Sequence, residues 1–342
     1  MSSQASSRWL FYCRPGFERD CLAELIARHP AARAIEMAEG WGSVRQIPPI
    51  ELSTLVFPRQ LLQWVADVTE LPSRDRISPL LTAVEALGQR FSDIWFEYPD
   101  TNEGKALSSF CKRFGPLFRE RAAHLLDTDP TAPRLHLFFP SLERCLLAIA
   151  DPASASPWPL GIARVKMPVE APSRSTLKLA EAFLVLVPEQ ELTQRLKPGM
   201  RAVDLGAAPG GWTYQLVTRG LKVIAVDNGP MKGSMAGHPQ VEHQRQDGFR
   251  YKPRRPVDWV VCDMVEQPHR VAALMAQWLA EGHANQALFN LKLPMKKRSE
   301  AVADAFELID DKLSAAGIRY TISARQLYHD REEVTVYLRR RR

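Results

Sequence analysis

The clearest pattern in this 342-residue chain is an alternation of short apolar runs and amphipathic stretches over its second half. The apolar runs have strand length, and we expect strands at Ala202–Leu205, Val223–Asp227, Trp259–Asp263, Ala287–Leu293, Tyr320–Ala324 and Val334–Leu338. Stretches with helical spacing lie before or between most of these runs, at Ser175–Val187, Trp212–Arg219, Arg270–Glu281 and Glu300–Ala315. The alternation predicts an α/β fold whose doubly wound, mostly parallel sheet carries helices on both faces.

The first 150 residues follow a different pattern, in which the elements are shorter and less regular. Strands are expected at Trp9–Tyr12, Leu55–Phe57, Ile94–Phe96, Leu135–Phe139 and Cys145–Ile149, with a turn at Pro140-Ser141 between the last two. Helices are expected at Phe17–Arg28 and at Leu107–Leu126, the second broken near Gly115-Pro116. We therefore predict two small α/β units at 1–72 and 73–150, a proline-rich linker at 151–172 and the larger domain at 173–342.

The amino-acid composition limits the classes of protein to which this chain can belong. The chain is 45% hydrophobic, which supports folded cores, and no run reaches the ~18 apolar residues of a membrane span. The N-terminus is polar and lacks the apolar segment of a secretory signal. The cysteines are scattered singly, without the spacing of zinc ligands, so we expect reduced thiols, no metal site and a cytoplasmic protein.

A net charge of +6 is compatible with a nucleic-acid partner, and the distribution of the basic residues says more. Basic clusters lie at Lys252–Arg255, Lys296–Arg298 and Arg339–Arg342. Any one of them can be ordinary solvated surface. Together, in the same half of the chain as the candidate ligand loop described next, they favour a polyanionic partner.

The candidate ligand loop follows the first strand of the larger domain, in the sequence VDLGAAPGGWT at residues 203–213. Small residues between a strand and a helix let a ligand approach the backbone. The loop lacks the G-x-G-x-x-G spacing that seats a pyrophosphate, since Ala208 replaces the second glycine and Pro209 stiffens the turn. Asp204 would also repel a diphosphate. A nucleoside-like ligand fits better, and S-adenosylmethionine has the right character.

Acidic residues follow the later strands, where ligands of doubly wound sheets bind. Asp227 ends the second strand and is placed to accept from ribose hydroxyls, with a helix cap as the alternative. Asp247 is placed to bind an adenine amino group, although an aspartate before glycine is also a common turn residue. Asp263 follows four apolar residues, where a charge needs a partner unless it serves as a cap.

Two lysines and one acid complete the candidate chemistry. Lys292 interrupts a buried strand, so it needs an anionic partner or a catalytic task, and an ion pair with Asp263 is the structural alternative. Lys178 alone reads as an ordinary surface lysine of an amphipathic helix. Either Glu332 or Glu333 points inward at the start of the last strand, and the register that decides between them is not readable from the sequence.

The chain resembles the FtsJ-type RNA 2′-O-ribose methyltransferases in four strings, which occur in the order VDLGAAPGGWT, VCDM, FNLKLPMKK and DREEVTV. The resemblance implies a Rossmann-like methyltransferase domain that uses S-adenosylmethionine. It also implies a Lys–Asp–Lys–Glu tetrad, which maps onto Lys178, Asp263, Lys292 and Glu333. The cofactor residues that we predict are Ser175, Asp204, Gly206, Ala208, Pro209, Gly210, Gly211, Trp212, Asp227, Asp247 and Asp263.

Within this family the resemblance extends over nearly the whole chain to bacterial enzymes that methylate a cytidine ribose in 23S rRNA. It implies that the N-terminal region contains ferredoxin-like and THUMP units, the second an RNA-binding module. We expect a monomer that binds 23S rRNA, either naked or in a preribosomal particle, and neither DNA nor membrane. The resemblance assigns Lys292 as the general base. Lys178 would lower the pKa of Lys292, whereas Asp263 and Glu333 would raise it.

Other functions remain open at this point. A methyltransferase for a small molecule or a protein would share the cofactor loop without needing both lysines and the basic clusters. A noncatalytic rRNA-binding factor is disfavoured by the intact loop and by Asp227. A dehydrogenase is disfavoured by the glycine spacing.

Overall fold

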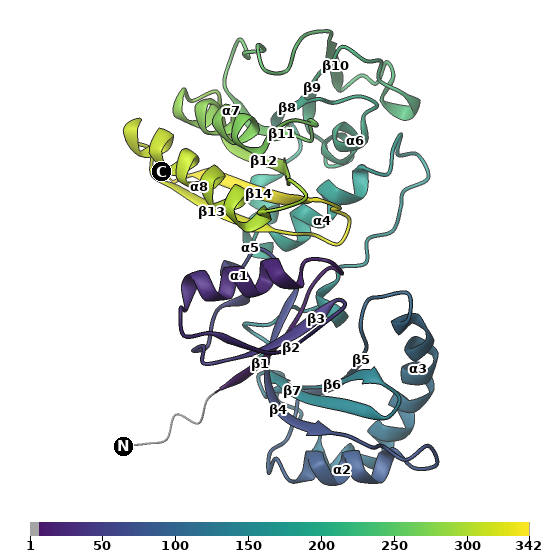
Figure 1. Ribbon diagram of the computed structural model, residues 1–342. Coiled ribbons are helices and arrows are strands. Elements are labelled where there is room, and N and C mark those ends of the chain that lie inside the picture. Colours follow the sequence, from purple (N-terminus) through teal and green to yellow (C-terminus); the bar gives the residue numbers. More distant parts are fainter. Residues whose placement is uncertain (1–6, 342) are drawn as a thin grey trace. The chain divides into compact units, whose positions relative to one another are not determined.

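The computed structural model describes residues 7–341, and the chain divides into two compact units, one ending at Ile162 and the other beginning at Ala163 (Figure 1). Each unit has its own 7-stranded sheet. The two sheets differ in strand direction, and this difference decides where a ligand can bind.

The second unit has the alternating order that the sequence predicts. Its elements are α4 (Thr176–Val185), α5 (Glu189–Arg195), β8 (Arg201–Leu205), α6 (Gly211–Val217), β9 (Lys222–Val226), β10 (Val241–Gln244), β11 (Val257–Cys262), α7 (Pro268–Ala280), β12 (Ala284–Lys292), α8 (Arg298–Ala315), β13 (Tyr320–Arg325) and β14 (Glu333–Arg340). The sheet order is β10-β9-β8-β11-β12-β14-β13. The strands from β10 to β12 are parallel, whereas β14 pairs antiparallel with both β12 and β13.

The order of this sheet reverses between β8 and β11. From β8 the chain moves outward to β9 and β10, and from β11 it moves the other way to β12. The right-handed crossovers therefore place α6 and α7 on opposite faces of the sheet, as Figure 1 shows. A crevice opens at the carboxyl ends of the strands at such a reversal.

The core of the second unit is centred on Trp259 of β11. Its strand is covered on both faces and reads as an almost continuous apolar run, which is typical of a central parallel strand. The Trp259 ring stacks on Tyr337, with centroids 5.7 Å apart, and meets the edge of Phe183 at 5.6 Å. Large buried rings of this kind supply much of the apolar burial that holds the strand ends in place.

The first unit contains β1 (Arg8–Tyr12), α1 (Glu18–Arg28), β2 (Arg33–Ala38), β3 (Trp41–Arg45), β4 (Gln60–Val68), α2 (Ile77–Glu85), β5 (Asp93–Glu97), α3 (Gly104–Arg121), β6 (Arg134–Ser141) and β7 (Arg144–Ala150). Its sheet order is β2-β3-β1-β4-β7-β6-β5. All neighbours in this order are antiparallel except β5 and β6.

The strand predicted at Leu55–Phe57 is wrong. These residues are buried, as their apolar character suggests, but they are not part of a sheet. The backbone N–H groups of Val56 and Phe57 donate to the Glu24 carboxylate instead, at 2.8 and 3.0 Å. The Glu24 carboxylate accepts the hydrogen bonds that a neighbouring strand would otherwise accept. The pattern of apolar residues does not predict this.

The predicted helix break near Gly115-Pro116 is also wrong, because α3 continues through both residues. A Cβ added at Gly115 would lie 3.0 Å from the Phe96 ring, so this glycine permits the close packing of α3 on β5. The apolar packing of the helix outweighs the hydrogen bond that Pro116 removes. The predicted turn at Pro140-Ser141 shifts as well, since Ser141 pairs with Arg144 and the turn lies between them.

The sheet of the first unit runs without interruption across the predicted boundary between residues 72 and 73. The strands on either side of this boundary meet where β4 pairs with β7. The division into a ferredoxin-like and a THUMP-like unit stays a prediction. Across residues 7–341, no helix combines the length and the apolar character needed to cross a bilayer.

Candidate active site at the carboxyl ends of the parallel strands

The loop after β8 has the shape of a ligand cradle. Gly206 has a φ of 76°, and a Cβ added there would lie 2.5 Å from Met264 Cγ, so only glycine fits without a shift. The Asp227 carboxylate at the end of β9 accepts hydrogen bonds from the backbone N–H groups of Ala208 and Gly229, at 3.0 and 2.6 Å. Asp227 therefore ties the loop to the neighbouring strand end.

A cavity of about 410 Å³ adjoins this loop. Several of the predicted cofactor residues line it, namely Gly206, Ala208, Asp227, Asp247 and Asp263. These residues come from the ends of successive parallel strands, where the sheet reversal opens the crevice. Asp247 is exposed and pairs with Arg250, at 3.6 Å between side-chain atoms.

The remaining predicted cofactor residues do not line this cavity. They are Ser175, Asp204, Pro209, Gly210, Gly211 and Trp212. The structure places several of them behind the loop. Gly211 lies against α4, where an added Cβ would be 2.2 Å from Ser175 Oγ, and Trp212 is buried in the core.

Asp204 is the most altered of these residues. It is buried, and its carboxylate accepts from the Thr213 hydroxyl at 2.6 Å. Burial raises its pKa to about 7, because the bond from Thr213 only partly offsets the loss of water and the charges of Asp263 and Asp227 oppose ionisation. Asp204 therefore holds the first turn of α6, and its role in cofactor binding stays a prediction.

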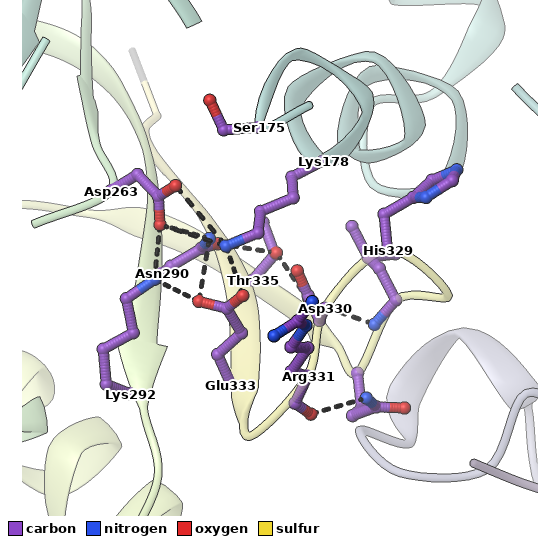
Figure 2. Close-up of polar contacts among 12 residues, drawn as sticks. Ser175, Lys178, Asp263, Asn290, Lys292, His329, Asp330, Arg331, Glu333 and Thr335 are labelled. Carbon is purple, nitrogen blue, oxygen red and sulfur yellow. Dashed lines mark hydrogen bonds and ion pairs between the residues drawn. The ribbon is translucent and has the colours of Figure 1, made fainter. Parts of the chain in front are cut away.

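The tetrad residues, far apart in the sequence, converge beside the cavity (Figure 2). They are Lys178 on α4, Asp263 just after β11, Lys292 at the end of β12 and Glu333 at the start of β14. Lys292 Nζ donates to both Asp263 Oδ1 and Glu333 Oε2. Lys178 Nζ contacts Glu333 Oε1 and lies 3.5 Å from both Asp263 oxygens.

The register of β14 decides which glutamate faces the site. Lys292 and Glu333 are direct partners in the antiparallel pairing of β12 with β14, so their side chains share one face. Glu333 is buried, whereas Glu332 is exposed and pairs with Arg298.

The electrostatic balance of the tetrad favours its charged forms. Burial opposes ionisation of Glu333, but the Lys292 and Lys178 ammonium groups outweigh it and lower the pKa of Glu333. Burial likewise opposes the charge on Lys292, but Asp263 and Glu333 outweigh it and raise the pKa of Lys292. The pKa shift that we expected from Lys178 is therefore overcome, because the carboxylates touch both lysines.

A second cavity, of about 520 Å³, borders Lys292. Its lining includes Val265, His269, Lys292, Pro294 and Asp304. Lys292 lines only this cavity and Asp263 only the first, yet the two side chains are in contact. Asp263 and Lys292 thus border two adjoining cavities, which share Val265 and Glu266 in their linings.

Two buried residues beside the tetrad escaped the sequence analysis. Asn290 donates through Nδ2 to Asp263 Oδ1 at 2.9 Å, and Thr335 donates to Asn290 Oδ1 at 2.7 Å. A usable signal was present for Asn290, because it precedes Lys292 by two positions in a strand and so lies on the same face.

The basic clusters are partly neutralised. Lys252 pairs with Glu281 at 2.9 Å, and Lys297 with Glu300 at 2.8 Å. Their contribution to binding a polyanion is therefore smaller than their number of positive charges suggests.

A doubly wound sheet with this loop, cavity and tetrad defines a methyltransferase that uses S-adenosylmethionine. An FtsJ-like methyltransferase model matches residues 171–318. A model of the N-terminal domain of ribosomal RNA large subunit methyltransferase M matches residues 75–151, and one of an RlmM ferredoxin-like domain matches residues 7–46. The predicted THUMP unit is not named by these models.

Similar proteins span almost the same length. The chain is 55% identical to ribosomal RNA large subunit methyltransferase M of Laribacter hongkongensis, over 97% of this chain and 96% of that protein. It is 50% identical to the protein of the same name from Thauera aminoaromatica, over 96% and 95% of the two chains. The chain therefore belongs to the ribosomal RNA large subunit methyltransferase M family, and it is an rRNA methyltransferase.

Proposed function

We propose that this enzyme transfers a methyl group from S-adenosylmethionine to the 2′-oxygen of a cytidine ribose in 23S rRNA, with Lys292 as the general base. The observation that carries the proposal is the contact of two tetrad residues that border two adjoining cavities. Asp263 borders the cavity beside the glycine loop and Lys292 borders the other. The contact between these two side chains is where a methyl donor and a methyl acceptor would meet.

The first cavity fits S-adenosylmethionine on structural grounds. Gly206 leaves space that a Cβ would fill, which lets a ligand approach bare backbone. Asp227 and Asp247 supply acceptors for ribose hydroxyls and for an adenine amino group, and Asp263 supplies a negative charge. When bound, the cofactor supplies an electrophilic methyl group on a positively charged sulfur.

Lys292 must be free of its proton before it can take one from the ribose hydroxyl. Asp263 and Glu333 hold Lys292 as an ammonium in the free protein, since together they raise its pKa. Positive charge arriving beside Asp263 weakens this hold, and an acceptor that excludes water from the second cavity favours the neutral amine. Lys292 then becomes a base only when the site is filled.

The other tetrad residues would act by position and charge. Asp263 and Glu333 hold the Lys292 nitrogen between them, which fixes it relative to both cavities. Lys178 also contacts the Glu333 carboxylate, and its positive charge weakens the attraction between Glu333 and Lys292. Alignment of the reacting oxygen with the methyl group would supply much of the rate.

The site is complete within one chain, which supports a monomer as the active form. The cysteines are all free and buried in this structure, which suits the reducing cytoplasm where rRNA is found. We assign RNA contact without a methyl-transfer role to the N-terminal unit.

Methyl-site mapping tests the proposal. Ribosomal RNA from cells lacking the protein is incubated with the purified enzyme and the cofactor, and positions that resist alkaline hydrolysis are mapped. We expect one new 2′-O-methyl cytidine in 23S rRNA, and none when that position carries 2′-deoxycytidine. Methylation of a base, or of 16S rRNA alone, would overturn the proposal. Parallel incubations with naked 23S rRNA and with preribosomal particles identify the preferred substrate.

A further inference from the structure

Behind the tetrad lies a short chain of buried polar side chains that the mechanism above does not use. Asp330, in the loop before β14, faces Thr335 on β14, and Thr335 faces Asn290 on β12 (Figure 2). Each of the three is fully buried. Thr335 Oγ lies 2.9 Å from Asp330 Oδ2 and 2.7 Å from Asn290 Oδ1. This chain connects Asp330 with the carboxylates around Lys292.

Strand register locks Asn290 and Thr335 into this arrangement. Asn290 is directly opposite Thr335, and Lys292 is directly opposite Glu333, two positions along the same pair of strands. Both pairs therefore lie on one face of the sheet. Asn290 Nδ2 donates to Asp263 Oδ1 and to Glu333 Oε2, the same two oxygens that Lys292 contacts.

Hydrogen counting then fixes the direction of each bond. The Asn290 amide must present its NH₂ group to the two carboxylates, because both accept and neither donates. Its oxygen therefore faces Thr335, and the single hydroxyl hydrogen of Thr335 is used on Asn290. Thr335 has no hydrogen left for Asp330, so a hydrogen bond between these two requires a proton on the Asp330 carboxyl.

The surroundings of Asp330 support a protonated carboxyl. Burial, together with the charges of Glu333 and Glu181, raises its pKa to about 8. The backbone N–H of Leu327, which donates to Asp330 Oδ2 at 3.1 Å, only partly offsets these effects. Glu181 belongs to α4 and Glu333 to β14, and His329 and Arg331 flank Asp330 in its own loop.

We propose that Asp330, as a neutral acid, is a positioning residue for methyl transfer: it donates to Thr335, and Thr335 thereby holds Asn290 with its NH₂ group on the Asp263 and Glu333 oxygens. The inference rests on the proposed function of the tetrad. Asn290 shares the oxygens that retain the Lys292 proton, so it weakens their hold on Lys292 and keeps the two carboxylates apart. Loss of the Asp330 proton turns Thr335 toward Asp330 and releases Asn290.

The pH dependence of single-turnover methyl transfer separates this role from general structural support. The wild-type rate is expected to rise with pH as Lys292 loses its proton. Above about pH 8, where Asp330 loses its proton, the rate should rise less steeply than the deprotonation of Lys292 alone would give. The D330N variant donates an N–H to Thr335 at every pH, so its rate should match the wild type near pH 7 and continue to rise above pH 8. Its amide cannot also accept from Leu327, so thermal melting is recorded alongside.

Thr335 offers a matched pair of variants in the same assay. T335V removes the hydroxyl and should slow transfer about tenfold near pH 7, with unchanged affinity for the cofactor, and the difference from the wild type should shrink above about pH 8. T335S keeps the hydroxyl and should retain the wild-type rate and pH profile. The proposal is overturned if D330N keeps the alkaline deficit of the wild type, or if T335V transfers methyl groups as fast as T335S near pH 7.

Two spectroscopic measurements on the free protein test the assignment of Asp330 without using the enzyme's activity. A variant that folds poorly therefore does not leave the assignment untested. The infrared difference spectrum between the wild type and D330N should contain the carbonyl band of one buried carboxylic acid, which disappears above about pH 8, because the contribution of Asp204 is common to both proteins and cancels. The side-chain NH₂ signals of Asn290 should shift in NMR spectra over the same pH range. Absence of both changes overturns the assignment of Asp330. If both occur while the wild type methylates no RNA, the proposed function fails and the assignment of Asp330 stands.

Discussion

The two units of this protein each contain a buried cluster of acids and bases, and only one of them is open to a ligand. In the first unit, Glu97 accepts from the Tyr12 hydroxyl at 2.9 Å, from His136 Nδ1 at 2.7 Å and from the Leu160 N–H at 2.6 Å. Arg134 Nε donates to the other nitrogen of His136 at 3.0 Å. Glu97 and His136 are 1% and 0% exposed, so every group of this cluster has a partner inside the protein.

The tetrad of the second unit has similar charges in a more open setting. The side chains of Lys178 and Lys292 are 17% and 22% exposed, and Lys292 borders a cavity. Strand direction explains the difference. The parallel strands of the second sheet end together at a reversal of order, whereas the largely antiparallel first sheet has no such shared edge. A closed cluster stabilises a fold, and an open one is available for chemistry.

The largest effect is expected for Lys292→Ala, which removes the base from the open cluster. Methyl transfer should fall by on the order of a thousandfold, because the proton acceptor that contacts Asp263 at the edge of the second cavity is lost. Cofactor affinity, measured by calorimetry, should stay close to that of the wild type. Lys312→Ala, at an exposed lysine outside the basic clusters, is the control and should leave the rate unchanged. If the Lys292→Ala enzyme transfers methyl groups as fast as this control, Lys292 is not the general base.

The next effect is expected for Glu97→Ala, which breaks the closed cluster. The buried His136 and Tyr12 lose their shared partner, and unfolding of the first unit should become easier by about 3 kcal/mol, as measured with urea. The methyl-transfer rate per folded molecule should be unchanged on a short RNA that carries the target. Glu85→Ala, which breaks an exposed pair with His124, is the control and should cost under about 0.5 kcal/mol. Equal costs for the two variants would contradict the comparison.

A smaller effect is expected for Gly206→Ala, which alters the wall of the first cavity. The new Cβ would meet Met264 at 2.5 Å in a backbone conformation with φ of 76°, so cofactor affinity should weaken by about tenfold. Gly199 has a similar φ of 87° but no atom within 4 Å of an added Cβ. Gly199→Ala therefore reproduces the backbone strain without the clash and should leave cofactor affinity unchanged in calorimetry. The cradle assignment fails if both variants bind alike.

The last effect, expected for Asp204→Asn, concerns only the pH dependence of stability. Burial raises the pKa of Asp204 to about 7, so the folded protein binds this proton more tightly than the unfolded chain does. Asp204 therefore supports the fold at low pH, and its support is lost as pH rises from about 4 toward 7, by at most about 1.4 kcal/mol per pH unit. Asp204→Asn should flatten this part of the stability curve. Glu300→Gln, at an exposed acid, should leave the slope as in the wild type.

The local pattern of residues was sufficient to predict most of the second unit. Its alternating runs identified the doubly wound sheet, and Asp227, Asp263 and Lys292 were singled out because charges beside buried strands require a partner or a task. Misassigned segments in the first unit, such as Leu55–Phe57, owe their conformation to distant groups. The Glu24 carboxylate that binds their N–H groups is more than 30 residues away in the sequence.

The sequence by itself determined which residue types stand at the strand ends, because period and polarity are local properties of the chain. Only the tertiary structure decided which of those residues meet. The register of β12 with β14 selected Glu333 over Glu332 and placed Thr335 opposite Asn290. The same convergence decided the direction of the pKa shift of Lys292, which the sequence left open, since a pKa depends on the sum of all neighbouring charges and their distances, which exist only once the chain has folded.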